Sequence, residues 1–245
     1  MANSTFYARL RRHQASPFNA HFYDKEPLTE EIIARRVRGA SQFFNLPVPE
    51  LAGGSDTLAS ITYTSASGPG SGIHYNMERL RAIGINNGDA FDAVITHELS
   101  HQFLSGNRFN FCRNSSWCTE LACDFIVGAR CRADLIASGK YKYAVSVMKV
   151  SASHPGGELR QKAVEAGFDF AGWLLARNIR VSFKYIISGI TKFLCLHSRE
   201  LNEAWSDFIE NPPQPEREIN IMELPDNNLI KIALLKYKPP TSHGN

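Results

Sequence analysis

The sequence has no apolar run long enough to cross a membrane. Its most apolar stretch, residues 168–196, is interrupted by five charged side chains: Asp169, Arg177, Arg180, Lys184 and Lys192. A membrane-spanning helix needs about 20 consecutive, predominantly apolar residues. The first residues of the chain also lack the apolar segment of a secretory signal. We therefore expect a soluble, cytoplasmic protein with no transmembrane segment.

Cysteine is scarce, with five residues among 245. The odd number argues against a framework of disulfides, which secreted proteins build from paired cysteines. No two cysteines stand in the C-x-x-C spacing that would indicate a cysteine-based metal site. We expect Cys112, Cys118, Cys123 and Cys131 to be buried structural thiols.

An excess of one charge is also lacking, because 27 Lys and Arg face 24 Asp and Glu, which gives a formal net charge of +3. This weak balance gives no reason to expect nucleic acid as a partner. One basic series, Arg177, Arg180 and Lys184, lies near Trp173 and Phe183 and would suit peripheral contact with a membrane surface. The solvated edge of a core helix explains it more simply, and we favour that interpretation.

Composition divides the chain into four segments. Residues 1–26 form a basic N-terminal arm, and residues 27–165 form the predicted core. A helical part of the same domain follows at residues 166–209, and residues 210–245 form a Pro-rich linker and tail.

Apolar residues at helical spacing predict several helices. The first begins at Thr29 and ends before Pro47, and a second covers residues 90–104 with Asp89 as its N-cap. A third covers residues 117–137 and is closed by Gly139. Further helices are expected after residue 156 and over residues 183–194.

Two short strands are predicted at residues 58–64 and 72–76, joined as a hairpin, while Pro and Gly predict a loop at residues 46–56. The order of elements indicates the α+β class, with a small antiparallel sheet packed on a helix and a helical C-terminal part.

The segment from His97 to His101 has the sequence H-E-L-S-H within a predicted helix. Histidines four residues apart lie on one helical face, where both imidazoles can bind a single zinc ion. Glu98 then stands near the open position of the metal, where a carboxylate can take a proton from bound water. The pattern predicts one zinc ion per chain with Glu98 as general base.

A third ligand is needed, because catalytic zinc sites usually have three protein ligands and water. Glu120 follows His101 after 18 residues and begins the next predicted helix, with Asp124 one turn further on. We predict that Glu120 is the ligand and that Asp124 accepts the outer N–H of a zinc-bound histidine. A solvated Glu120 in the first helical turn is the alternative.

H-E-L-S-H followed by E-L-A-C-D resembles the gluzincin pattern of zinc metallopeptidases. It is similar in particular to the family of the CAAX prenyl endopeptidase and the HtpX heat-shock protease. Those peptidases carry a further Ser/Thr-His-Pro with an Arg six positions after the His, and this chain has His154 and Arg160 at that spacing. The resemblance implies a zincin-like fold, His154 as a stabiliser of the transition state, and Arg160 as a brace of the site.

The chain also departs from that family. Its two metal motifs are closer together, the flanking transmembrane helices are missing, and Cys123 replaces the usual Ala before Asp124. The compact spacing is closer to small soluble gluzincins and to the ImmA/IrrE-like regulatory proteases.

In gluzincins an edge strand above the zinc pairs with an extended peptide. The resemblance therefore nominates the residues of the second predicted strand for substrate binding: Gly72, Ile73, His74 and Tyr75. For the His74 side chain, simple exposure to solvent is the favoured alternative.

Two functional hypotheses follow from these motifs. The first is a zinc endopeptidase acting on a peptide or protein substrate. The second is a regulatory or effector protein that uses a zincin fold to bind a protein partner with little hydrolysis. The carboxylate of Glu98 favours the first, because a binding module has no need of a general base.

Overall fold

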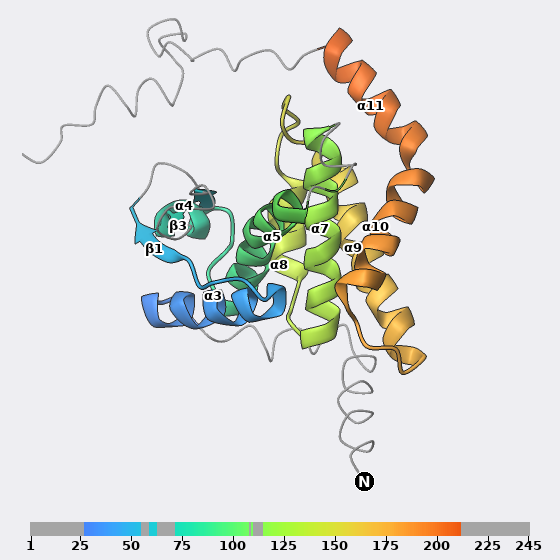
Figure 1. Ribbon diagram of the computed structural model, residues 1–245. Helices are drawn as coiled ribbons and strands as arrows, with labels where there is room; N and C mark the ends of the chain where they lie inside the picture. Colours follow the sequence, from blue (N-terminus) through green and yellow to red (C-terminus); the bar gives the residue numbers. More distant parts are fainter. Residues whose placement is uncertain (1–26, 55–58, 63–71, 108, 110–114, 212–245) are drawn as a thin grey trace, which may run out of the picture. The chain divides into compact units, whose positions relative to one another are not determined.

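The computed structural model describes residues 27–54, 59–62, 72–107, 109 and 115–211, which all belong to one compact unit (Figure 1). The predicted N-terminal arm, the linker and tail after Asn211, and Cys112 lie outside these residues. The helices and strands, in chain order, are α3 (Glu30–Phe44), β1 (Glu50–Gly53), β2 (Ala59–Thr62), β3 (Gly72–Tyr75), α4 (Met77–Ala82), α5 (Gly88–Asn107), α7 (Ser116–Asp134), α8 (Gly139–Ser146), α9 (Gly157–Ala176), α10 (Phe183–Leu196) and α11 (Ser198–Glu210).

The α+β class is confirmed, but the sheet is mixed and not purely antiparallel. Its strand order is β1-β3-β2, so β3 is the central strand. β2 pairs with β3 in the antiparallel sense, as the hairpin prediction required, whereas β1 pairs with β3 in parallel. The prediction of a loop at residues 46–56 was therefore wrong for Glu50–Gly53, which forms β1.

Local hydrogen bonds explain where three helices begin. Thr29 accepts a hydrogen bond from the backbone N–H of Ile32, as predicted from the sequence, and Ser115 accepts one from Cys118. Asn87, and not Asp89, caps α5, because its Oδ1 accepts the N–H of Ala90 at 2.8 Å.

The end of α7 also differs from the prediction. The helix finishes at Asp134, and Leu135 follows it in the left-handed region with φ 60°. Gly139, the predicted cap, instead opens α8.

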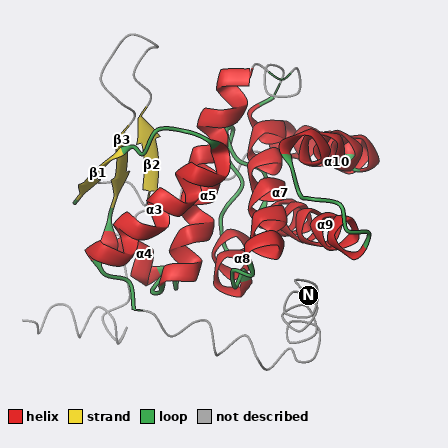
Figure 2. Cartoon of the chain, turned by 60° about the horizontal axis from the view of Figure 1, so that its bottom comes forward, coloured by secondary structure: helices red, strands yellow, loops and turns green. Residues whose placement is uncertain are grey.

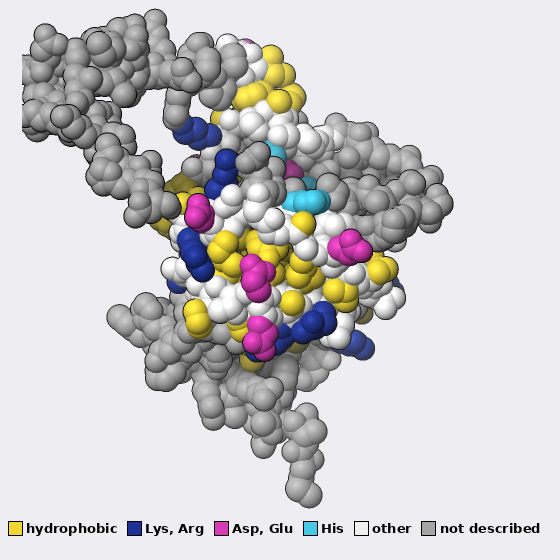
Figure 3. All heavy atoms as spheres, turned by 90° about the vertical axis from the view of Figure 1, so that its left-hand side faces the viewer, with side chains coloured by type: hydrophobic (Ala, Val, Ile, Leu, Met, Phe, Trp, Pro, Cys, Tyr) yellow, Lys and Arg dark blue, Asp and Glu magenta, His cyan; other side chains and the backbone are white. Residues whose placement is uncertain are grey.

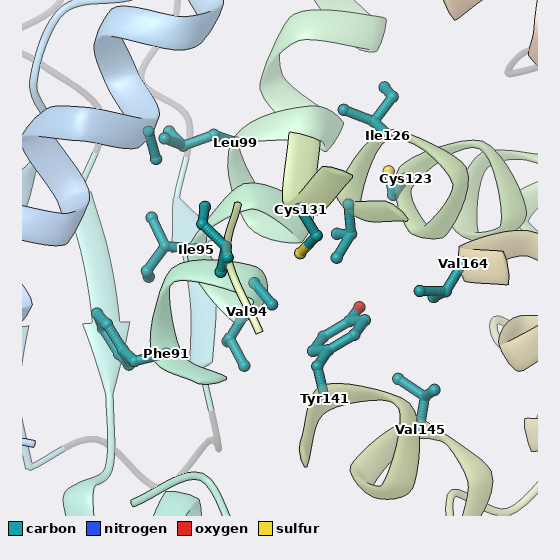
Figure 4. Packing of buried hydrophobic residues seen from close by; sticks show 14 of the residues in the cluster. Phe91, Val94, Ile95, Leu99, Cys123, Ile126, Cys131, Tyr141, Val145 and Val164 are labelled. Carbon is teal, nitrogen blue, oxygen red and sulfur yellow. The ribbon is translucent and has the colours of Figure 1, made fainter. Parts of the chain in front are cut away.

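Helix α5 is the central element of the described unit. α3 and the sheet contact it on one side, and α7 and α8 contact it on the other (Figure 2). It is consequently buried around most of its circumference, as expected for a core helix. Phe91, Ile95 and Leu99 pack into the hydrophobic core, where α8 contributes Tyr141 and Val145 (Figure 4).

A buried ionic network fixes the first half of α5 against its neighbours. Arg130 of α7 donates to Asp92 at 2.6 Å and also to the hydroxyl of Thr96. Arg36 of α3 pairs with Asp92 at 3.3 Å and with Asp89 at 2.8 Å. The network therefore sets the rotation of α5 about its axis, which decides where His97 points one turn later.

Helices α7 and α9 cross at two glycines. A Cβ atom on Gly128 would overlap the carbonyl oxygen of Val164, and one on Gly167 would overlap that of Phe125. Only glycine permits this approach, and it brings Arg160 at the start of α9 over Asp124 of α7. No helix among the described residues is both long and apolar enough to cross a membrane.

Candidate metal centre

Two histidines of α5 provide the base of the candidate centre. His97 and His101 are one helical turn apart, and their Nε2 atoms lie 3.2 Å from each other. Their rings are nearly perpendicular, with centroids 4.9 Å apart. Two imidazole nitrogens thus face one point beside the helix, as the H-E-x-x-H spacing predicts.

Glu120 of α7 completes a triangle of candidate ligand residues with His97 and His101, and each oxygen of its carboxylate faces one of the two imidazoles. Its Oε2 lies 3.1 Å from His97 Nε2, and its Oε1 lies 3.2 Å from His101 Nε2. Zinc–nitrogen and zinc–oxygen bonds of about 2.0–2.1 Å in a tetrahedral arrangement place ligand atoms roughly 3.3 Å apart. Two imidazole nitrogens and a carboxylate are donors that zinc accepts, and their distances of 3.1–3.2 Å are close to this spacing. The carboxylate that we nominated from the sequence is the one that lies beside both imidazoles.

Asp124 contacts the ring nitrogen of His97 that points away from the candidate ligand atoms. Its Oδ1 lies 3.0 Å from His97 Nδ1, which leaves Nε2 of that ring facing the triangle. Arg160 donates from Nε to Oδ2 at 2.7 Å and from Nη2 to Oδ1 at 3.1 Å. Asp124 thus lies beside the outer nitrogen of His97, where its predicted role places it, and Arg160 contacts the Asp124 carboxylate.

Tyr141 is a member of the centre that sequence reasoning missed. Its side chain lies on the buried face of α8 (Figure 4). Its hydroxyl donates to Asp124 Oδ1 at 2.7 Å. No motif surrounds it, and the available signal was weak. Tyr141, Ala144 and Val145 have helical spacing, and a buried tyrosine hydroxyl needs a partner.

The carboxylates set the protonation of His97. Burial opposes a charged imidazole, but Asp124 and Glu120 outweigh it and raise the pKa of His97 from 6.5 to about 10. Burial likewise opposes ionisation of the Glu120 and Asp124 carboxyl groups, because it favours their neutral form. The neighbouring histidines nevertheless lower the pKa of Glu120, and Arg160 together with His97 lowers the pKa of Asp124. Without a metal ion, a proton on His97 thus neutralises part of the negative charge.

Glu98 and His154 stand beside the triangle and not within it. Glu98 is partly buried at a cavity that His97, His154 and Arg160 also line. Burial raises the pKa of Glu98, although His97 and His101 act against this. A carboxylate with a raised pKa next to a cavity is suited to receive a proton.

His154 is 45% exposed, and its Nε2 lies 3.6 Å from Glu120 Oε1. Its Nδ1 is 2.7 Å from Ser153 Oγ. Burial lowers the pKa of His154 against the attraction of Glu120. If the Ser153 hydroxyl donates to Nδ1, the ring proton resides on Nε2 and faces the centre. The Ser-His-Pro segment thus lies beside Glu120.

Cys123 provides a second possible third ligand. Its sulfur is buried and lies within 4.8 Å of ligand atoms of His97 and His101, so these three residues could hold a metal ion. The oxygens of Glu120 are closer to both Nε2 atoms, at 3.1 and 3.2 Å. The shorter distances favour Glu120 over Cys123 as the candidate third ligand.

The predicted role of the second strand, residues Gly72, Ile73, His74 and Tyr75, was wrong in one respect. This strand is β3, and both of its edges are already paired, with β1 and with β2. An extended peptide therefore cannot add to it. Ile73 and Tyr75 are buried, and the hydroxyl of Tyr75 is bonded to Glu30. His74 remains partly exposed, and histidine side chains reach the surface on the face that carries α3 and the sheet (Figure 3).

Comparison with protein-family models, curated proteins and solved structures finds no match to this chain. The functional interpretation therefore depends on the residues of the candidate centre.

Proposed function

We propose that this chain is a zinc-dependent endopeptidase of the gluzincin type. The observation that carries the proposal is the triangle of His97, His101 and Glu120. The two imidazole nitrogens lie 3.2 Å apart, and each lies 3.1–3.2 Å from one oxygen of the Glu120 carboxylate, close to the spacing of ligand atoms around tetrahedral zinc. When bound, zinc would polarise the peptide carbonyl and lower the pKa of a coordinated water towards about 7.

Glu98 acts as the general base in this proposal. Its carboxylate receives the proton of the attacking water and returns it to the amine that leaves. The raised pKa of Glu98 supports this role, because a group that protonates readily also holds the proton between the two transfers.

His154 supplies a hydrogen bond to the oxygen that becomes negative during the reaction. Its Nε2 faces the centre, 3.6 Å from Glu120 Oε1. Asp124 fixes the ring of His97 through Nδ1, and the two hydrogen bonds from Arg160 keep the Asp124 carboxylate in place. A protein that only binds a partner would need neither Glu98 nor His154 at the cavity, so we favour catalysis over that alternative.

The proposal is tested with purified protein, reconstituted with zinc and incubated with a peptide library derived from a proteome. We expect about one zinc ion per chain and cleavage that stops when a chelator removes it. A chain that takes up no zinc at neutral pH, or that cleaves equally well without metal, would contradict the proposal.

A further inference from the structure

The segment that carries His154 is neither helix nor strand. It covers residues 148–156, between α8 and α9. Within it, the N–H of Ser151 donates to the carbonyl oxygen of His154 at 2.9 Å, and the N–H of His154 donates to the carbonyl oxygen of Ser151 at 3.2 Å. These two bonds close residues 151–154 into one turn, so the place of Ser151 sets the place of His154.

Two side chains at the start of α7 hold this turn. Trp117 Nε1 donates to the carbonyl oxygen of Ser151 at 2.9 Å, and the hydroxyl of Ser116 donates to the carbonyl oxygen of Ala152 at 3.2 Å. Trp117 is only 1% exposed, and a buried indole N–H that loses its acceptor is costly. Ser116 is exposed and can bond to water instead. The indole is therefore the stronger of the two anchors.

The helix that anchors the turn also carries Glu120, one turn after Trp117. α7 thus places a candidate ligand and, through Trp117, the turn that faces it. The result is the distance of 3.6 Å between His154 Nε2 and Glu120 Oε1. Such placement matters for a reaction, because a displacement of about 1 Å can cost roughly 100-fold in rate.

Helix α11 supplies aromatic rings that pack on Trp117. The ring of Trp205 meets the Trp117 ring edge to face, with centroids 4.9 Å apart, and the Phe208 ring lies at 5.9 Å. No residue of α11 is fully buried, so the helix adds little to the hydrophobic core. Its contact with Trp117 links it, through Ser151, to the candidate centre.

We propose that Trp117 is a positioning residue for His154 and that Trp205 of α11 keeps the Trp117 indole in place. Both act through Ser151 and not on the reacting atoms. The inference rests on the proposed endopeptidase function, in which His154 stabilises the oxygen that becomes negative.

The first test measures amide hydrogen exchange in metal-free protein. Trp117→Phe removes the indole N–H and keeps an aromatic ring, Trp205→Ala removes the ring that packs on it, and Trp173→Phe is the control on α9, where Trp173 is 49% exposed. Exchange at Ser151 and His154 should rise about three- to tenfold in Trp117→Phe, the worth of one hydrogen bond. It should rise less in Trp205→Ala and stay unchanged in the control. Unchanged exchange in Trp117→Phe would overturn the inference.

The second test measures kcat and KM of zinc-loaded Trp117→Phe, His154→Ala and the double variant. Trp117→Phe should lower kcat by about tenfold and leave KM and zinc content unchanged. His154→Ala should lower kcat by about 100–1000-fold, as expected for the loss of one donor to a developing negative charge. Trp117→Phe should then have no further effect in the His154→Ala background, because its only route is already removed.

The outcomes separate this inference from the proposed function. If Trp117→Phe lowers kcat by the same factor with and without His154, its role is merely structural, and the inference is overturned while the endopeptidase proposal stands. If the wild type cleaves no peptide, the endopeptidase proposal fails, and the amide exchange of Ser151 and His154 alone decides whether Trp117 holds the turn.

Discussion

Replacement of Asp124 by Ala removes an acceptor that three buried side chains share. Arg160 donates to it twice, at 2.7 and 3.1 Å, Tyr141 donates at 2.7 Å, and His97 Nδ1 lies at 3.0 Å. Asp124 itself is fully buried, and Arg160 is only 3% exposed. In the variant, the guanidinium of Arg160 keeps its charge but loses its nearest counter-ion.

The expected cost follows from that unpaired charge. Removal of one partner of a buried ion pair costs about 3–5 kcal/mol in free energy of unfolding. With a urea dependence of roughly 2 kcal/mol per molar, the midpoint should fall by about 2 M. Zinc affinity should also fall, by about 10–100-fold, because His97 loses the group that orients it.

A double-mutant cycle separates the charge from the lost contacts. The second variant is Arg160→Leu, and all unfolding curves are measured in chelator, so that zinc contributes nothing. The double variant should be more stable than Asp124→Ala alone, with a coupling energy of at least about 1 kcal/mol, since no buried charge is left unpaired. Additive losses in the double variant would refute the reasoning that an orphaned Arg160 dominates the cost.

Three further predictions concern the ligand set, the helix crossing and the pH dependence. Cys123→Ala should retain zinc, and X-ray absorption should show only nitrogen and oxygen ligands at about 2.0–2.1 Å, whereas Glu120→Ala should lose the metal. A zinc–sulfur distance of about 2.3 Å in the wild type would instead favour Cys123 as the ligand. Gly128→Ala should lower the free energy of unfolding by at least about 1–3 kcal/mol, because the new methyl overlaps the backbone of α9. The control Gly139→Ala, which has open space around its Cβ position, should change this free energy little, and equal effects of the two variants would contradict the close crossing of α7 and α9. The pKa of His97 is raised from 6.5 to about 10, so its contribution to the free energy of unfolding of metal-free protein should be complete below pH 6.5 and disappear as the pH rises through 10. His97→Gln should abolish this part of the pH dependence of stability, and an unchanged dependence in that variant would contradict the shift.

The candidate ligands were largely predictable because His97, His101 and Glu120 lie within two helices. Residues four apart share a helical face, so the positions of His97 and His101, and of Glu120 and Asp124, followed from helical periodicity alone. Their meeting required only that α7 turn back along α5. His154 and Arg160 were nominated by the family resemblance, and the structure brings them into contact with Glu120 and Asp124.

The sheet was less predictable because strand order depends on pairing between distant segments. β1 lies in a Pro- and Gly-containing stretch that has no alternating pattern, and only its parallel pairing with β3 makes it a strand. A hairpin prediction cannot show that a third strand closes the free edge of β3, so the supposed peptide-binding edge was misassigned. Asp89 was misread as a cap for a similar reason, because its carboxylate pairs with Arg36 on α3.

Hydrolysis by Glu98→Gln at full zinc occupancy tests the central claim most directly. The amide is nearly isosteric with the carboxylate and leaves His97, His101 and Glu120 in place, but it cannot accept the proton of the attacking water. We predict that this variant binds zinc as the wild type does and cleaves peptides several orders of magnitude more slowly. Cleavage by Glu98→Gln at the wild-type rate, with equal zinc content, would contradict the assignment of this centre as a Glu98-dependent endopeptidase.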